Sequence, residues 1–95
     1  MTIRERETIM QAIRMERIRQ DHKWGTDFVD RSDERWLTIL AEEFGEVAEA
    51  VLRDSDEDVE KELIQVAAVV VSWLEYRTPR RDQYHEVQRE VSQPE

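Results

Sequence analysis

Acidic and amide side chains recur three residues apart in two separate segments of the chain. Glu43 and Glu46 form the first pair, which Glu42 directly precedes, and Glu62 and Gln65 form the second. In a helix, residues three apart lie on the same side, one turn from each other, so each pair presents its oxygen atoms to one point. Hard divalent cations take oxygen ligands. Two such pairs that faced each other would therefore make a site for Mg²⁺ or Mn²⁺.

The two pairs belong to segments that the sequence predicts as helices joined by a short turn. Ser32 is a suitable N-cap for a helix that runs to about residue 53, and Ser55 for one over about residues 56–77. Pro79 ends the second of these helices. Because the connection around Ser55 is so short, we expect the two helices to pack antiparallel as a hairpin.

The hairpin places the two pairs at matching heights. Glu46 lies nine residues before Ser55 and Glu62 seven after it, so at about 1.5 Å per residue their heights differ by about 3 Å. Glu43 and Gln65 lie one turn further from Ser55, again at nearly equal heights. Either pair alone is readily explained as a solvated acidic face. Their match favours a site, because three converging carboxylates repel one another unless a cation neutralises them.

The remaining pattern predicts an all-α protein. The 95 residues include only two glycines and two prolines, which is typical of helical proteins. We expect a first helix over residues 2–21, a polar loop over 22–31, and a short helix in the C-terminal tail around Tyr84. The expected fold is a single domain over residues 1–95, an antiparallel helical bundle of three main helices plus a short C-terminal helix, assembled as an oligomer. On the middle helix, the predicted core stripe is Leu37, Leu40, Phe44, Val47 and Val51.

Composition excludes several classes of protein. A net charge of −9, from 23 acidic and 14 basic residues, argues against a general nucleic-acid binder. Without cysteine the chain has no disulfide or thiolate chemistry. No apolar run is long enough to span a membrane and no signal peptide is evident, so we expect a cytoplasmic protein. His22 and His85 lie far from either acidic pair, unlike the Glu-x-x-His pattern of di-iron bundles.

The segments 35–47 and 62–67 together resemble the MazG-like all-α nucleoside triphosphate pyrophosphohydrolases. The signature of that family is Glu-Glu-x-x-Glu, a variable spacer and Glu-x-x-Asp, and the spacer here has 15 residues. Residues 21–25 (Asp-His-Lys-Trp-Gly) are also similar to the segment before the metal helix in some phage and bacterial members. The resemblance implies cleavage of a nucleoside triphosphate to the monophosphate and pyrophosphate, and a homodimer or homotetramer.

The resemblance also implies roles for particular residues. Glu43, Glu46, Glu62 and Gln65 fall on metal-ligand positions, and Glu42 is the candidate catalytic residue, which holds a further ion or orients the attacking water. The family usually carries Asp where this chain has Gln65. An amide oxygen can still coordinate a hard cation, but the site loses one negative charge. Two functions therefore stay open: an active pyrophosphohydrolase, and a catalytically silent helical interaction or nucleotide-binding protein.

Three further residues are candidates for substrate binding. Trp24 is suited to stacking on a nucleobase, and Lys23 and Arg77 are suited to binding phosphate oxygens, either in the same subunit or in a neighbour. Each also has a simpler explanation, since an aromatic residue can pack in the core and most cations in so Arg-rich a chain lie on its surface. For Trp36, packing in the core is the favoured explanation.

Overall fold

The structure is a computed structural model that describes residues 1–24 and 32–77. These residues form three α-helices and no strand: α1 (Ile3–Trp24), α2 (Asp33–Leu52) and α3 (Asp56–Tyr76). The prediction of an all-α protein is confirmed for this part of the chain. The predicted short helix around Tyr84 lies outside the described residues. None of the three helices combines the length and the apolarity that crossing a membrane requires.

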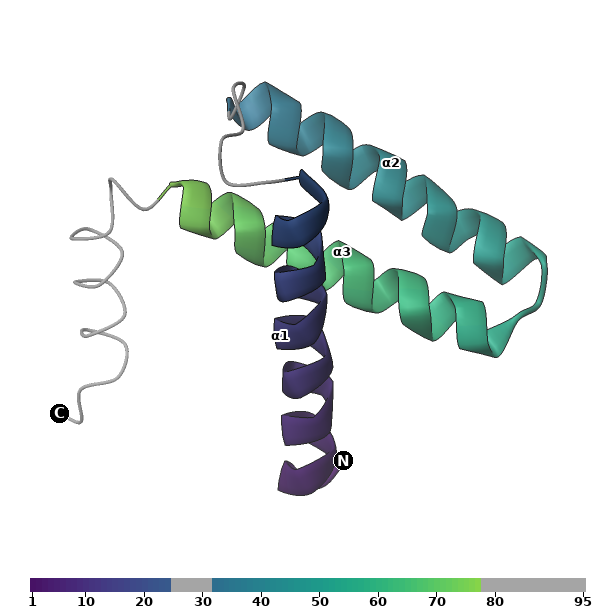
Figure 1. Cartoon of the computed structure of the whole chain (residues 1–95). Helices are drawn as coiled ribbons and strands as arrows, with labels where there is room; N and C mark the ends of the chain where they lie inside the picture. The colour runs from purple at the N-terminus through teal and green to yellow at the C-terminus, as the bar shows by residue number, and fades with distance from the viewer. Residues whose placement is uncertain (25–31, 78–95) are drawn as a thin grey trace, which may run out of the picture.

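Helices α2 and α3 form the antiparallel hairpin that the sequence predicts (Figure 1). Each begins at its predicted cap. The Ser32 hydroxyl accepts a hydrogen bond from the Arg35 backbone N–H at 3.2 Å, and the Ser55 hydroxyl accepts one from the Asp58 N–H at 3.3 Å. Serine oxygens in this position satisfy donors that the first helical turn leaves unpaired, so these local signals locate both helix starts.

The turn of the hairpin is closed by backbone hydrogen bonds around Asp54. Asp54 has a positive φ of 57°, a conformation that aspartate tolerates better than most residues. Its N–H donates to the Val51 carbonyl at 3.0 Å, and the Ser55 N–H donates to the Ala50 carbonyl at 3.4 Å. This is the Schellman arrangement, which satisfies the last carbonyls of α2 and fixes where the chain reverses. The heights of residues across the hairpin depend on this reversal.

The core lies between α2 and α3 and uses only part of the predicted stripe of α2, since Leu40 packs against it and Val47 is half-buried. Trp36, Ile39 and Val69 form the buried cluster, with Leu40, Trp73 and Tyr76 packed against it. Core packing of Trp36 is thus confirmed. Leu37, Phe44 and Val51, by contrast, are 57, 66 and 56% exposed. Apolar residues cover more than one stripe of α2, so periodicity alone does not select which stripe faces α3.

The open end of the hairpin is held by one carboxylate. Asp33, in the first turn of α2, accepts a hydrogen bond from the Trp73 indole N–H at 2.7 Å through one oxygen. Its other oxygen pairs with the Arg77 guanidinium at 2.6 Å. The start of α2 is therefore fixed to the end of α3 by contacts that span the interface.

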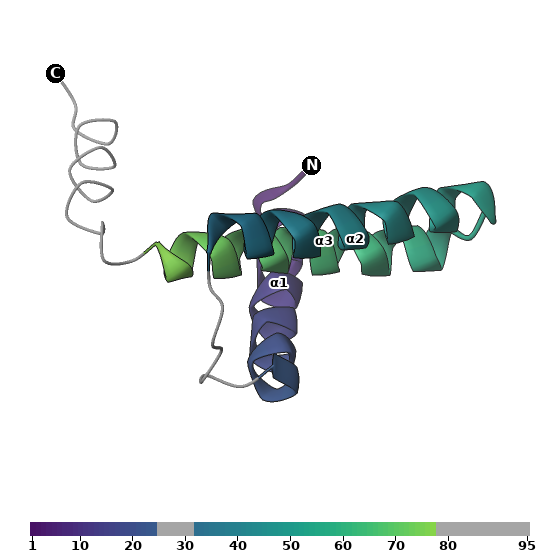
Figure 2. The same ribbon diagram turned by 90° about the horizontal axis from the view of Figure 1, so that it is seen from above.

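Helix α1 crosses α3 steeply instead of running alongside the hairpin (Figures 1 and 2). In the described part of the chain, it packs against α3 and not against α2. Residues 1–11 are all exposed, so the first half of α1 projects away from the hairpin. The helix also continues to Trp24, three residues beyond its predicted end, which places Lys23 on a helix and not in a loop. His22 and Lys23 are favourable in a last helical turn because of the helix dipole.

Candidate metal centre

Three carboxylates from two helices converge near the middle of the hairpin. Oxygen atoms of Glu43 and Glu46 on α2 and of Glu62 on α3 all lie within 4.8 Å of one another. Glu43 and Glu62 are half-buried, whereas Glu46 is exposed. Glu43 lies on the side of α2 that faces α3, between the core residues Ile39 and Ala50. The structure thus brings these three side chains together, at the place that the matched heights predict.

The side-chain amide of Gln65 lies against the same carboxylates. With its nitrogen turned toward them, it donates hydrogen bonds to Glu62 Oε2 at 2.8 Å and to Glu43 Oε2 at 3.2 Å. With its oxygen turned toward them, it adds an oxygen atom from a fourth side chain to the cluster. The orientation with the nitrogen inward suits a metal-free cluster, because the N–H groups stabilise the carboxylates directly. The orientation with the oxygen inward suits a metal-bound cluster, because the oxygen is able to coordinate the cation together with the carboxylates.

The surroundings favour the protonated form of two of these acids. Partial burial raises the pKa of Glu43 above its usual value of 4.5, and the charges of Glu46 and Glu62 raise it further, while Lys23 opposes the shift. The pKa of Glu62 is also raised, first by partial burial and then by its hydrogen bond with Glu46 and the charge of that residue. Ionisation of these two carboxyl groups is thus unfavourable in the metal-free site, and a bound cation would stabilise their charged forms.

The donor set fits a hard divalent cation. Its atoms are carboxylate oxygens, with an amide oxygen available from Gln65, and neither thiolate nor imidazole takes part. Such oxygen-only sets suit Mg²⁺ or Mn²⁺ better than metals that prefer nitrogen or sulfur. Within residues 1–24 and 32–77, no other group of three or more acidic or histidine side chains converges in this way.

The other residues that the sequence singles out lie at varying distances from this centre. Lys23, in the last turn of α1, is close enough to lower the pKa of Glu43. Glu42 is exposed and is not one of the converging carboxylates. Arg77 pairs with Asp33 at the open end of the hairpin, about 22 Å along α3 from Glu62 at 1.5 Å per residue. The side chain of Trp24 lies outside the described part of the chain.

Helix α1 adds residues that the sequence did not single out. Arg19 pairs with Glu16 through N–O contacts of 2.8 and 2.5 Å, and Gln20 donates to the backbone carbonyl of Gln65 at 3.4 Å. With Lys23, these residues follow the spacing of one helical face. That spacing is the signal that could have found them, but ending the predicted helix at residue 21 separated Lys23 from the rest.

Comparisons with known proteins found no relative of this chain. No family model matches the chain, and neither a curated protein nor a solved structure matches it. What the centre can do chemically therefore follows from its own residues and their geometry.

Proposed function

We propose that the protein is a Mg²⁺-dependent nucleoside triphosphate pyrophosphohydrolase of the MazG-like kind that its sequence resembles. It would cleave an NTP or dNTP to the monophosphate and pyrophosphate, and Mn²⁺ would substitute for Mg²⁺. The observation that carries the proposal is the convergence of Glu43, Glu46 and Glu62 within 4.8 Å, with the amide of Gln65 beside them. The same four positions match the metal-ligand positions of the family signature.

The proposed roles follow from where each side chain lies. When bound, Mg²⁺ would supply positive charge that neutralises the polyphosphate and polarises its phosphorus–oxygen bonds. Glu43, Glu46 and Glu62 provide the negative charge that holds the cation. Glu42, exposed beside them on α2, is the proposed residue that orients the attacking water and accepts its proton. Lys23 is proposed to bind a phosphate oxygen.

We also propose that the protein is a homodimer or homotetramer. Apolar side chains line a second stripe along α2 and continue on α3, where the single chain leaves them exposed. Such a face in so small a domain is typical of a protein–protein contact. In the assembly, Trp24 is proposed to stack on the nucleobase and Arg77 to reach phosphate oxygens of a neighbouring subunit. The exposed apolar residues of this face are Leu37, Phe44, Val51, Leu63, Val70 and Leu74.

One observation favours a second candidate, a catalytically silent helical protein. The Gln65 nitrogen is able to donate to Glu62 and Glu43 at once, so the fold has a way to satisfy both carboxylates without a cation. A fold that tolerates its acidic cluster in this way could keep the hairpin while having lost activity.

Pyrophosphate release from each common NTP and dNTP, with Mg²⁺ or Mn²⁺, separates the two candidates. The enzyme predicts turnover of at least one nucleotide and its loss in Glu46→Ala. The matched control is Glu49→Ala, which removes an exposed acid one turn further along α2 and outside the cluster. No turnover of any canonical or modified nucleotide would contradict the enzyme, and hydrolysis that appears only in Gln65→Asp would favour the silent protein.

A further inference from the structure

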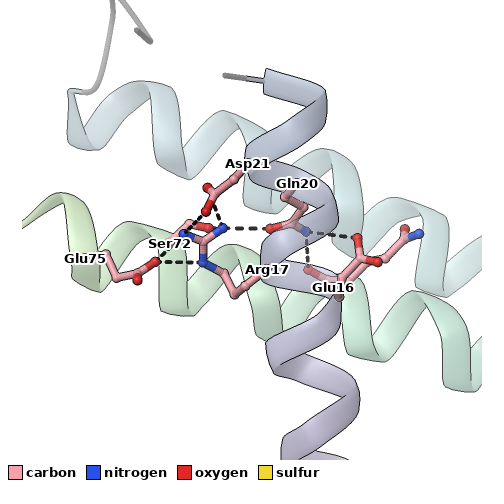
Figure 3. Close-up of polar contacts among 7 residues, drawn as sticks. Glu16, Arg17, Gln20, Asp21, Ser72 and Glu75 are labelled. Atoms are coloured by element: carbon pink, nitrogen blue, oxygen red, sulfur yellow. Dashed lines mark hydrogen bonds and ion pairs between the residues drawn. The ribbon is translucent and has the colours of Figure 1, made fainter. Parts of the chain in front are cut away.

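A buried amide joins α1 to α3 beside the acidic cluster. The side chain of Gln20 is 1% exposed, and its nitrogen donates to the backbone carbonyl of Gln65 at 3.4 Å. Its oxygen accepts a hydrogen bond from the Ser72 hydroxyl, also at 3.4 Å (Figure 3). A buried amide is costly unless its polar atoms are paired, so these bonds favour one placement of α1 on α3. That placement brings the last turns of α1 to the height of Gln65.

The same amide helps to orient an arginine. Glu16 accepts two hydrogen bonds from the Arg19 guanidinium, at 2.8 and 2.5 Å, and a longer one from Gln20 at 3.4 Å. The side chain of Glu16 is only 12% exposed, whereas that of Arg19 is 52% exposed. A guanidinium has five N–H donors, and this pairing uses two of them. Arg19 is therefore held in place with a solvent-facing side that still carries donors.

The orientation of Arg19 matters because of what lies next to it. The pKa of Arg19 is raised mainly by its hydrogen bonds to Glu16 and also by the charge of Glu43, a member of the acidic cluster. Lys23, one turn further along α1, interacts with Glu43 as well. The bond from Gln20 to the Gln65 carbonyl brings this end of α1 to the cluster, and both cations interact electrostatically with Glu43 there.

Another arginine of α1 is used differently. Arg17 forms hydrogen bonds with Asp21 on its own helix and with Glu75 on α3, and its side chain is only 16% exposed (Figure 3). Arg17 therefore connects α1 to α3 where the two helices cross, whereas Arg19 faces solvent beside the cluster.

We infer that Arg19 binds a phosphate group of the nucleotide and that Gln20 is the positioning residue that places it there. The inference rests on the proposed function, since it needs a polyphosphate held at Glu43, Glu46 and Glu62. A planar guanidinium matches the oxygens of a phosphate group and remains charged at any physiological pH. Lys23 alone would offer a point charge without that directional match.

Binding of inorganic triphosphate in the presence of Mg²⁺, measured by calorimetry on the full chain, tests this without a choice of nucleobase. Arg19→Gln is expected to weaken binding about tenfold, since charge-assisted hydrogen bonds are the strong ones. Its affinity for Mn²⁺ alone should not fall, because the substitution removes a positive charge near Glu43. The control is Arg14→Gln, which removes the same charge from α1 at an exposed position whose guanidinium bonds to Gln11. Arg19→Lys should recover part of the lost affinity.

Gln20→Met separates positioning from general stability. It should weaken triphosphate binding in the wild-type background and weaken it less in Arg19→Gln, because its effect on binding passes mainly through Arg19. Additive losses would contradict the positioning role, and equal binding by Arg19→Gln and Arg14→Gln would contradict the phosphate contact. If the wild-type protein bound no Mn²⁺ at the cluster, the proposed function would fail as well, which the metal-only titration distinguishes.

Discussion

Glu43 on α2 and Glu62 on α3 face each other across the hairpin, and one amide, that of Gln65, is within hydrogen-bonding distance of both. Both acids are half-buried, and each has a raised pKa because of that burial and of nearby carboxylates. The two helices thus hold like charges together at the point where they pack. The Gln65 amide is able to satisfy both carboxylates through hydrogen bonds.

Gln65→Asp should make the protein more dependent on metal. The substitution replaces a hydrogen-bond donor by a fourth carboxylate, so the metal-free protein should lose about 1 kcal/mol of unfolding free energy. With Mg²⁺ present, the added charge should tighten metal binding about tenfold, since ligand charge tunes the affinity of such sites. Thermal unfolding with and without Mg²⁺ measures both effects. Gln65→Asn, which has the length of Asp without its charge, is the control, and an equal response of the two variants would contradict the account.

The stability of the metal-free protein should fall as pH rises above about 4.5. Glu43 and Glu62 have pKa values in the folded state above the usual 4.5. Between the pKa of the unfolded chain and the raised pKa of the folded state, the folded protein therefore binds more protons than the unfolded chain. Unfolding free energy decreases with pH in that window, and the stabilisation is complete only below it. Urea unfolding across pH 4–7 measures the slope. Glu43→Gln should flatten it, and an unchanged slope in that variant would show that other groups cause it.

Local hydrogen bonding explains what the sequence predicts well. Ser32 and Ser55 start their helices through contacts with residues three positions away, so the type and spacing of neighbouring residues suffice to locate them. Because the reversal near Ser55 is that well defined, the heights of Glu46 and Glu62 follow from counting residues. The convergence of the acidic side chains is therefore predictable from the sequence alone.

Contacts between distant parts of the chain explain what the sequence did not predict. The choice of Trp36 and Ile39 over Leu37 and Phe44 as the core side of α2 depends on α3, which periodicity within α2 does not contain. The crossing of α1 likewise depends on Gln20, whose partners lie 45 and 52 residues away. A buried glutamine in a charged helix gives no local sign of this role.

Removal of the Asp33 side chain should open the end of the hairpin. Asp33→Ala deletes the partner of both Trp73 and Arg77, and we expect a loss of about 1 kcal/mol, because the carboxylate is about half exposed. Urea unfolding measures the change. Glu34→Ala is the control, since it removes a neighbouring acid from the same first turn of α2. Equal losses in the two variants would mean that the contacts across the hairpin contribute nothing beyond the helix dipole.

Substitution of the exposed apolar face should change the state of assembly. Phe44 is 66% exposed and lies in the middle of that face, so Phe44→Ser should shift the protein toward monomer. Light scattering coupled to size-exclusion chromatography measures the mass at matched concentrations. Leu52→Ser, which changes a residue that is 85% exposed at the end of α2, should leave the mass unchanged. A wild-type protein that is already monomeric would contradict the proposed oligomer.

The most direct test of the metal centre is to map where Mn²⁺ binds. Paramagnetic broadening of backbone amide signals during a Mn²⁺ titration reports which residues lie near the ion. The chain supplies its own control, because the turn between α2 and α3 is densely acidic, with Asp54, Asp56, Glu57 and Asp58. The account predicts that broadening starts at residues 42–47 and 61–66 and that Glu46→Gln weakens it there. Broadening that starts at residues 54–58, or spreads evenly over the acidic surface, would contradict a metal centre at Glu43, Glu46 and Glu62.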